Sequence, residues 1–184
     1  MKKQIISLLI LLSFSSSHTY SSEHFWNPAK DGNKIILIRH ALAPGGGDPE
    51  GFNIKDCRTQ RNLNEIGINQ SKKIGKLFEE KKIKIDQVLS SQWCRCKDTA
   101  KYAFGKFKEF SALNSTYTPP YDQNEKQQIK DLKKYVNNWN GKGGNLVLVT
   151  HYVIILAITG ETARSGELVI TDKNFKVLST VNTF

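Results

Sequence analysis

The 184-residue sequence is short of acidic side chains, with 17 Asp and Glu against 27 Lys and Arg and a formal net charge of +10. Five of the basic residues are Arg, and the Lys residues are spread along the chain without interleaved aromatic side chains. Nucleic-acid sites need basic and aromatic residues together, so we expect no nucleic-acid partner. The positive surplus favours an anionic substrate through steering, and a solvated Lys-rich surface explains it equally well.

Cysteine and histidine are also scarce, with three Cys and four His in the chain. No Cys-x₂-Cys pairs with clustered His occur, so we expect no structural zinc, no other metal and no organic cofactor. In an exported protein, three Cys allow one disulfide and one free thiol.

Near the N-terminus, the apolar run from Ile5 to Phe14 is too short to span a bilayer. Two Lys precede this run and a Ser-rich stretch follows it, which predicts a secretory signal peptide over residues 1–21, with an uncleaved anchor as the alternative. Cleavage before Ser22 would leave one domain, residues 22–184. We therefore expect a periplasmic or secreted protein without stable membrane insertion.

Strand and helix patterns alternate along the rest of the chain, and neither a repeat nor a linker interrupts them. This alternation predicts an α/β fold, a three-layer sandwich with a mainly parallel central sheet flanked by helices. The expected strands are 35–38, 86–90, a weak one at 107–113, 145–150, and a hairpin of 166–171 with 175–181. The expected helices are 64–82, 93–104, 124–139 and 152–159, with an irregular lead-in at 22–33 and a long loop at 41–62.

Polar, chemically active residues stand where three of these strands end. Arg39 and His40 follow the first strand, residues 90–95 with Arg95 follow the second, and His151 follows the strand 145–150. Parallel strands bring such residues to one edge of the sheet. Two guanidinium groups bind a phosphate bidentately, and a neutral imidazole beside them is a nucleophile. The pattern indicates phosphoryl chemistry.

Four segments, ILIRHA, NLNEIGINQS, SSQWCRCKDTA and LVLVTH, together resemble the motifs of the histidine phosphatase (phosphoglycerate mutase-like) superfamily, in the same order and spacing. The resemblance spans about residues 34–171. Within the superfamily, the APGGGDP loop and the WCRC segment look most like small exported bacterial members, such as the lipopolysaccharide core heptose phosphatase. The chain has no room for the large helical cap of the acid phosphatase branch.

The resemblance implies a phosphoglycerate mutase-like fold and a phosphomonoesterase that works without metal or cofactor. It makes His40 the nucleophile that becomes a phosphohistidine, while Arg39, Arg95 and His151 hold the phosphoryl oxygens. The substrate would be a phosphorylated small molecule or a cell-envelope glycan or lipid. A phosphomutase fits export poorly, and the sequence does not indicate an oligomeric state.

One departure from the family pattern concerns the general acid. Mutase-like members place a Glu after the third strand, where this chain reads ALNSTYTPPYDQ. Asp48 is the best substitute, although an Asp before Pro49 also suits a simple turn; the weaker choices are Asp122, Glu125 and Glu161. The missing Glu leaves two alternatives open: a phosphohistidine phosphatase, which needs no dedicated acid, and a non-catalytic phosphate-binding module.

Two further features border the expected pocket. Arg61 either reaches the phosphate or pairs with a carboxylate, and the sequence does not decide between them. A Cys57–Cys94 disulfide would tie the long loop to the Arg95 segment, with Cys96 as the alternative partner. The large aromatic residues Phe78, Trp93 and Trp139 are expected in the core.

Overall fold

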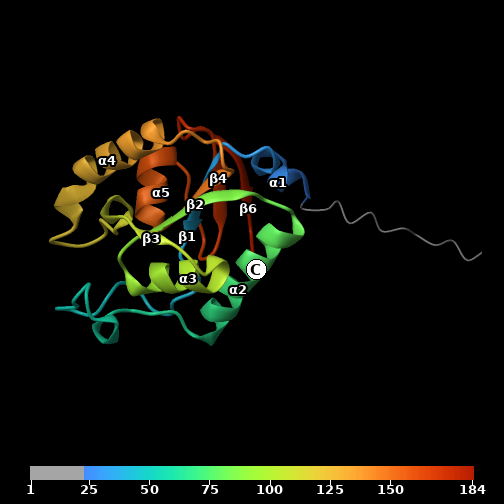
Figure 1. Ribbon diagram of the computed structural model, residues 1–184. Helices are drawn as coiled ribbons and strands as arrows, with labels where there is room; N and C mark the ends of the chain where they lie inside the picture. Colours follow the sequence, from blue (N-terminus) through green and yellow to red (C-terminus); the bar gives the residue numbers. More distant parts are fainter. Residues whose placement is uncertain (1–22) are drawn as a thin grey trace, which may run out of the picture.

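The computed structural model describes residues 23–184, so the predicted signal peptide and its cleavage site lie outside the described residues. Six strands form one sheet in the order β3-β2-β4-β1-β5-β6, with helices on both faces (Figure 1). The predicted three-layer α/β sandwich is therefore confirmed. The strands are β1 (Ile35–Arg39), β2 (Ile85–Ser90), β3 (Lys108–Glu109), β4 (Asn145–Thr150), β5 (Leu168–Thr171) and β6 (Val177–Val181).

The sheet is mainly parallel, as expected. Strand β1 runs parallel to β4, and β4 to β2, whereas β5 and β6 form the predicted antiparallel hairpin at one edge. In the β1–β4 register, Arg39 lies opposite Thr150. His40 and His151 directly follow these two residues in the chain. Both histidines therefore leave the sheet at the same point.

Alternate residues of β1 face two separate cores, because successive side chains of a strand point to opposite faces. Ile36 and Ile38 pack beneath α1 (Glu23–Lys30), α2 (Glu65–Glu80) and α3 (Cys94–Phe104). Ile35 and Leu37 pack beneath α4 (Glu125–Asn138) and α5 (Tyr152–Thr159). Burial on both faces explains the continuous apolar run that predicted this strand.

Helix α2 begins as predicted, with the Asn64 side chain accepting a hydrogen bond from the Gly67 backbone N–H. Gly67 also lets the helix approach the loop that follows β1, because a Cβ there would collide with the Leu42 carbonyl oxygen. The Gln70 side chain accepts a hydrogen bond from the Leu42 N–H at 3.0 Å. Helix α2 thus holds the first turn of the 41–62 loop.

The prediction of an irregular lead-in over residues 22–33 is wrong, because residues Glu23–Lys30 form helix α1 with Pro28 inside it. Trp26 is buried and its ring meets Phe78 edge-to-face at 5.3 Å, and Ser179 Oγ of β6 donates to the Phe25 carbonyl. Tertiary packing of one apolar face outweighs the hydrogen bond that proline cannot make.

The weak strand expected over 107–113 is much shorter in the structure. Only Lys108–Glu109 pair with β2, and Ser111–Leu113 form a 3-10 turn that buries Ala112 and Leu113. Two other short 3-10 turns, Cys57–Thr59 and Asp122–Asn124, lie in loops.

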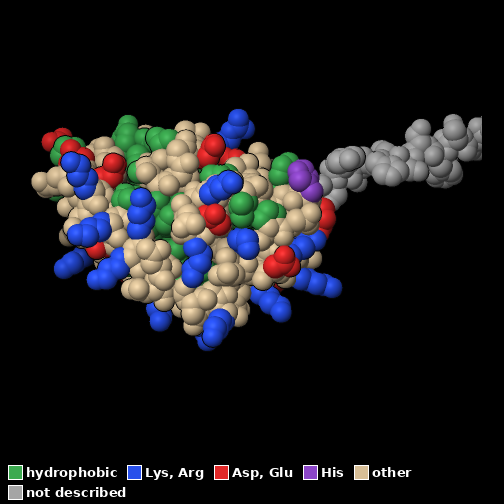
Figure 2. Space-filling view, turned by 90° about the horizontal axis from the view of Figure 1, so that it is seen from above, with side chains coloured by type: hydrophobic (Ala, Val, Ile, Leu, Met, Phe, Trp, Pro, Cys, Tyr) green, Lys and Arg blue, Asp and Glu red, His purple; other side chains and the backbone are tan. Residues whose placement is uncertain are grey.

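The surface carries its positive charge in a dispersed form. On the face seen in Figure 2, Lys and Arg side chains are spread over several elements, with acidic side chains between them. Within residues 23–184, no helix is long and apolar enough to cross a bilayer. The dispersed charge is typical of a solvated surface with long-range steering rather than of one extended binding face.

Candidate active site

The two strand-end histidines form the floor of a pocket at the carboxyl edge of the parallel strands. The His40 N–H donates to the Thr150 carbonyl at 2.9 Å, which ties the end of β1 to the end of β4. Both imidazoles are 2% exposed, and their ring centroids lie 5.4 Å apart. The predicted convergence of His40, His151 and Arg95 is confirmed.

The hydrogen bonds of His40 define its tautomer. Its Nδ1 lies 2.8 Å from the Ala41 carbonyl oxygen, which only accepts, so Nδ1 carries the proton. Nε2 is then the unprotonated nitrogen, and its lone pair accepts a hydrogen bond from Arg95 Nε at 3.2 Å. Burial lowers the pKa of His40 well below its ordinary value, and the positive charges of Arg95, Arg61 and Arg39 lower it further. His40 is therefore neutral, with Nε2 facing the pocket.

The second histidine lies beside a hydroxyl and a thiol. His151 Nε2 is 3.0 Å from Ser91 Oγ and 3.4 Å from Cys96 Sγ. Burial also lowers the pKa of His151, followed by the charge of Arg95. Burial raises the pKa of Cys96 to about 12, so this residue stays a neutral thiol. The two imidazoles and the thiol beneath the guanidinium groups are therefore uncharged.

The guanidinium groups of Arg39, Arg61 and Arg95 surround the two imidazoles. Arg39 Nη1 donates to the Ala163 carbonyl at 2.9 Å, and Arg61 donates to the Ala43 carbonyl. Among residues 23–184, the buried Nε atoms of both side chains have no hydrogen-bond partner. Buried donors without partners are costly, and an oxyanion in the pocket would satisfy them. The sequence left open whether Arg61 reaches the pocket or pairs with a carboxylate. The structure supports the first interpretation, because Arg61 lines the pocket.

Asp48 is the carboxylate among the residues that line the pocket. Its Oδ1 and Oδ2 accept from Arg95 Nη1 and Nη2 at 2.7 and 3.1 Å, in a bidentate pair. Trp93 Nε1 and the Arg61 backbone N–H each donate to it at 3.0 Å. Burial alone would raise the pKa of Asp48, but the hydrogen bonds and charge of Arg95 outweigh it and hold that pKa below its ordinary value. Asp48 is ionised here.

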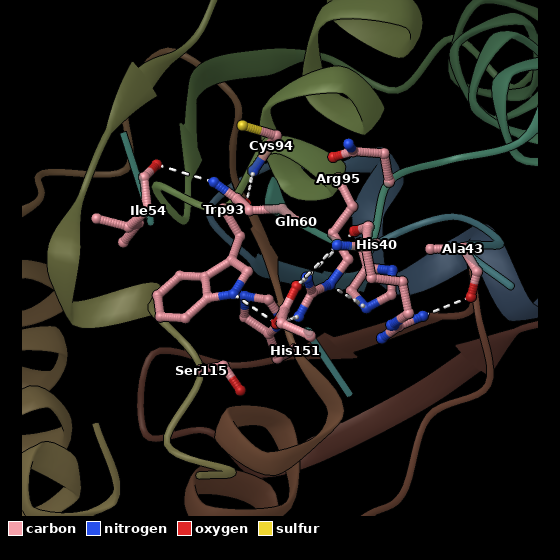
Figure 3. Close-up of polar contacts among 12 residues, drawn as sticks. His40, Ala43, Ile54, Gln60, Trp93, Cys94, Arg95, Ser115 and His151 are labelled. Atoms are coloured by element: carbon pink, nitrogen blue, oxygen red, sulfur yellow. Dashed lines mark hydrogen bonds and ion pairs between the residues drawn. The ribbon is translucent and has the colours of Figure 1, made fainter. Parts of the chain in front are cut away.

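The 41–62 loop forms the wall of the pocket, and a disulfide fastens it. Cys57 and Cys94 are bonded, with Cα atoms 5.6 Å apart, while Cys96 is free and buried. The predicted Cys57–Cys94 disulfide is thus confirmed, and the alternative partner Cys96 is not used. Gln60 reinforces the joint, because it accepts from the Cys94 N–H at 3.0 Å and donates to the Ile54 carbonyl (Figure 3).

The enclosed part of the pocket has a volume of about 150 Å³. In Figure 3, the His40 side chain from the end of β1 and the Arg95 side chain from the start of α3 point toward one another, and Trp93, the N-cap residue of α3, lies beside them. Sequence reasoning placed Trp93 in the core; it is buried there, and its indole N–H also reaches the site. The residues at the mouth of the pocket were not predicted from the sequence. They are Ser115, Tyr117, Thr118 and Tyr152.

The remaining acid candidates are not at this pocket. Asp122, Glu125 and Glu161 are absent from its lining, and Glu125 instead accepts from Thr116 Oγ1 at 3.2 Å. Two larger grooves, of about 690 and 660 Å³, flank the β2–β3 edge without any His or Arg in their walls. In the described part of the chain, no group of three or more His, Cys, Asp or Glu side chains could hold a metal ion.

Comparison with a protein-family model gives one match, to the Histidine phosphatase superfamily (branch 1), over residues 35–142. These residues include Arg39 and His40 at the end of β1 and Arg95 at the start of α3. No curated protein matches the sequence significantly.

Solved structures share the fold at low sequence identity. The protein histidine phosphatase SixA complexed with tungstate has a TM-score of 0.55 at 12% identity, over 82% of this chain and 97% of that chain. A mutant phosphoserine phosphatase from Entamoeba histolytica in complex with phosphoserine has a TM-score of 0.56 at 16% identity, over 82% and 97%. A protein from Thermus thermophilus, TTHB049, has a TM-score of 0.55 at 15% identity, over 81% and 99%. These likenesses show a common fold.

Proposed function

This chain belongs to the histidine phosphatase superfamily, and we propose that it is a phosphomonoesterase whose nucleophile is His40. The lone pair of His40 Nε2 attacks phosphorus, an N–P bond forms, and the P–O bond breaks with its electrons on the leaving oxygen. Water then hydrolyses the phosphohistidine and releases inorganic phosphate.

The observation that carries this proposal is the neutral His40 among three guanidinium groups. Arg39, Arg61 and Arg95 supply the planar N–H groups that stabilise charge on the phosphoryl oxygens. Their charge also disfavours protonation of the attacking nitrogen. Ser91 Oγ lies 3.0 Å from His151 Nε2, so a hydrogen bond between them holds the His151 ring beside the pocket, where it can assist another phosphoryl oxygen.

We further propose that the enzyme acts in the periplasm or outside the cell. The Cys57–Cys94 disulfide supports this location, because disulfides persist in oxidising compartments and are rare in the cytosol. N-terminal sequencing of the exported protein should begin near Ser22, and a retained Met1 would contradict it. The substrate would be a phosphorylated small molecule or a cell-envelope glycan or lipid, with lipopolysaccharide core heptose phosphate as the specific candidate.

A second candidate is a phosphohistidine phosphatase. The observation that favours it is the hydrogen bonding of Asp48, which leaves no protonated carboxyl group in the pocket. A phosphoramidate has a good leaving group, so its cleavage does not require a protonated carboxyl group. The SixA likeness supports the same alternative.

The decisive experiment is to trap the covalent intermediate. Brief reaction with labelled substrate and an alkaline quench should leave acid-labile label on the peptide that contains His40. His40→Ala should abolish both label and turnover. The matched control is His24→Ala, because His24 is exposed on α1 and distant in the fold from the β1 end.

A substrate panel separates the candidates. Turnover of sugar phosphates or lipopolysaccharide core indicates a phosphomonoesterase, and turnover of phosphohistidine peptides alone indicates the second candidate. Phosphate binding without label or turnover on any substrate would show a binding module. Activity in His40→Ala, or its loss with a chelator in the wild type, would contradict the mechanism.

A further inference from the structure

We propose that Asp48 competes with the substrate phosphoryl group for Arg95 in the resting pocket, and that substrate displaces it from Arg95 and thereby makes it the proton donor. The inference rests on the proposed function, and it concerns the wall of the pocket rather than the nucleophile. It explains how one carboxylate can be an anion in the empty site and an acid during turnover.

The contacts of Asp48 are those expected of a bound oxyanion. Its two oxygens accept four hydrogen bonds: two from the Arg95 guanidinium, one from the Trp93 indole and one from the Arg61 backbone N–H. The Arg95–Asp48 pair is almost fully buried, with side-chain exposures of 4% and 9%. A carboxylate and a phosphoryl group use the same planar geometry on guanidinium N–H groups.

The position of Arg95 brings the attacking atom and the Asp48 carboxylate to one guanidinium group. Its Nε already donates to His40 Nε2, the attacking atom, at 3.2 Å. A phosphorus atom within reach of Nε2 therefore places its oxygens on the Arg95 side chain. The two N–H groups best suited to them are bonded to Asp48, so the carboxylate and the substrate compete for one partner.

The chain before Asp48 permits the displacement. Three glycines precede it, two of them with left-handed backbone, Gly45 at φ +90° and Gly47 at φ +77°. A Cβ built on Gly46 or Gly47 would meet no atom within 4 Å, so the segment is not packed against a neighbour. The Cys57–Cys94 disulfide holds the later part of the loop. Movement can therefore be confined to residues 45–48.

Displacement alters the proton balance of Asp48. Away from Arg95 and beside a phosphoryl dianion, the carboxylate loses its stabilising charge and takes a proton from solvent. As the P–O bond breaks, that proton passes to the leaving oxygen and an alcohol departs. The carboxylate then receives a proton from the attacking water during hydrolysis of phosphohistidine. When phosphate leaves, Asp48 returns to Arg95 and releases this proton to solvent.

Calorimetric titration of the folded protein with inorganic phosphate tests the competition. Asp48→Asn keeps the side-chain shape and removes the charge, so phosphate should bind about tenfold more tightly, as when the open pocket is populated about one-tenth of the time. The matched control is Glu50→Gln, which removes one charge from an exposed position of the same loop and should change nothing. Equal or weaker phosphate binding in Asp48→Asn would overturn the competition.

Kinetics test the proton donor. Asp48→Asn should lower kcat about 100-fold for an alkyl phosphate, and much less for p-nitrophenyl phosphate, whose leaving oxygen needs no proton. Equal losses on both substrates would overturn the acid role. If the wild type turns over neither substrate, the proposed function fails, while the phosphate affinities still decide the competition.

A second variant guards against misfolding of Asp48→Asn. Trp93→Phe removes only the indole donor to Asp48 and retains an aromatic ring against Phe52 and Tyr121. It weakens the hold on the carboxylate, so it should tighten phosphate binding by about two- to fivefold, in the range of one lost hydrogen bond. Weaker phosphate binding there would show that the indole serves the phosphate directly and would contradict the exchange.

Discussion

The pocket consists of two regions that the chain builds in different ways. The floor, made of His40, Arg95 and His151, stands on the ends of regular elements whose register is set by paired strands. The wall, residues 41–62, contains one three-residue 3-10 turn and is otherwise irregular. The floor is thus positioned by the main-chain hydrogen bonds of the sheet, and the wall by side-chain contacts and one covalent bond.

This difference assigns each region its task. A nucleophile and its guanidinium partners must keep a fixed geometry throughout the reaction, which strands and helices provide. A group that first blocks the pocket and then donates a proton must move, and a glycine-containing loop permits it. The disulfide limits how far that movement spreads along the wall.

The largest effect is expected from removing the disulfide that fastens the wall. The Cys57–Cys94 bond joins positions 37 residues apart, and loop-closure entropy of that size corresponds to about 4 kcal/mol of stability, a model-dependent value. Replacing both residues with Ser should lower the free energy of urea unfolding by about this amount. Amide exchange should then speed up in residues 43–62 and stay slow in β1 and β4.

Reductant provides the control for this experiment. Dithiothreitol should destabilise the wild type to the level of the double Ser variant and should leave that variant unchanged. Equal loss of protection in the wall and in the sheet would mean that the two regions unfold together.

Arg95→Lys should damage the floor without changing its charge. A lysine ammonium is a point donor and cannot bind two phosphoryl oxygens in fixed geometry. Loss of such donors costs about 10²–10³ in kcat. Steady-state kinetics should show that loss, whereas Arg58→Lys, at an exposed Arg paired with Asp56 in the wall, should keep wild-type rates. Near-normal turnover in Arg95→Lys would remove Arg95 from the reaction.

Acid should affect the two regions in different pH ranges. The unfolded chain has histidines with a pKa of about 6.5, and the fold lowers the pKa of His40 and His151, first through burial and then through Arg95. Below pH 6.5 the unfolded chain therefore binds more protons, and stability falls by at most about 1.4 kcal/mol per pH unit for each histidine. Asp48 has a lowered pKa, so its contribution is present above its ordinary pKa of 3.8 and is lost below it.

Urea unfolding at pH 7.5, 6.5 and 5.5 measures the histidine contribution. His151→Asn should flatten the decline of stability below pH 6.5 by the contribution of one histidine. An identical slope in the wild type and in His151→Asn would show that the fold does not lower the pKa of His151.

The floor could be predicted from the sequence because its signals are local. The apolar runs before His40 and His151 identify buried strands, and parallel pairing brings their ends together. The phosphate-binding role of Arg39 and Arg95 stays a prediction, although both line the pocket.

The long loop 41–62 and its Cys57–Cys94 disulfide were predicted and are confirmed. The contacts inside this wall and the N-terminal helix could not be predicted, since they depend on distant residues. Nothing near Asp48 in the sequence indicates that it binds Arg95, 47 positions away. Helix α1 contains Pro28 and forms because Trp26 packs against Phe78. The sequence left Cys96 as an alternative partner of Cys57, because Cys94 and Cys96 belong to the same helix.

The smallest expected effect lies at the mouth, where the wall and the floor open to solvent. The ring of Tyr117 is 58% exposed and lies 6.0 Å from that of Tyr152, which packs against the Arg39 guanidinium at 5.1 Å. In the proposed mechanism the floor binds the phosphoryl group, so we expect these rings to contact the leaving group. An aromatic contact of this kind contributes about 0.5–1.5 kcal/mol, so Tyr117→Ala should raise KM for a bulky sugar phosphate about two- to tenfold. Phosphate affinity and kcat should stay unchanged, as they should for all substrates in Tyr102→Ala, whose exposed ring lies on α3 away from the pocket. A large fall in kcat would instead place Tyr117 in the catalytic floor and shift the boundary between the two regions.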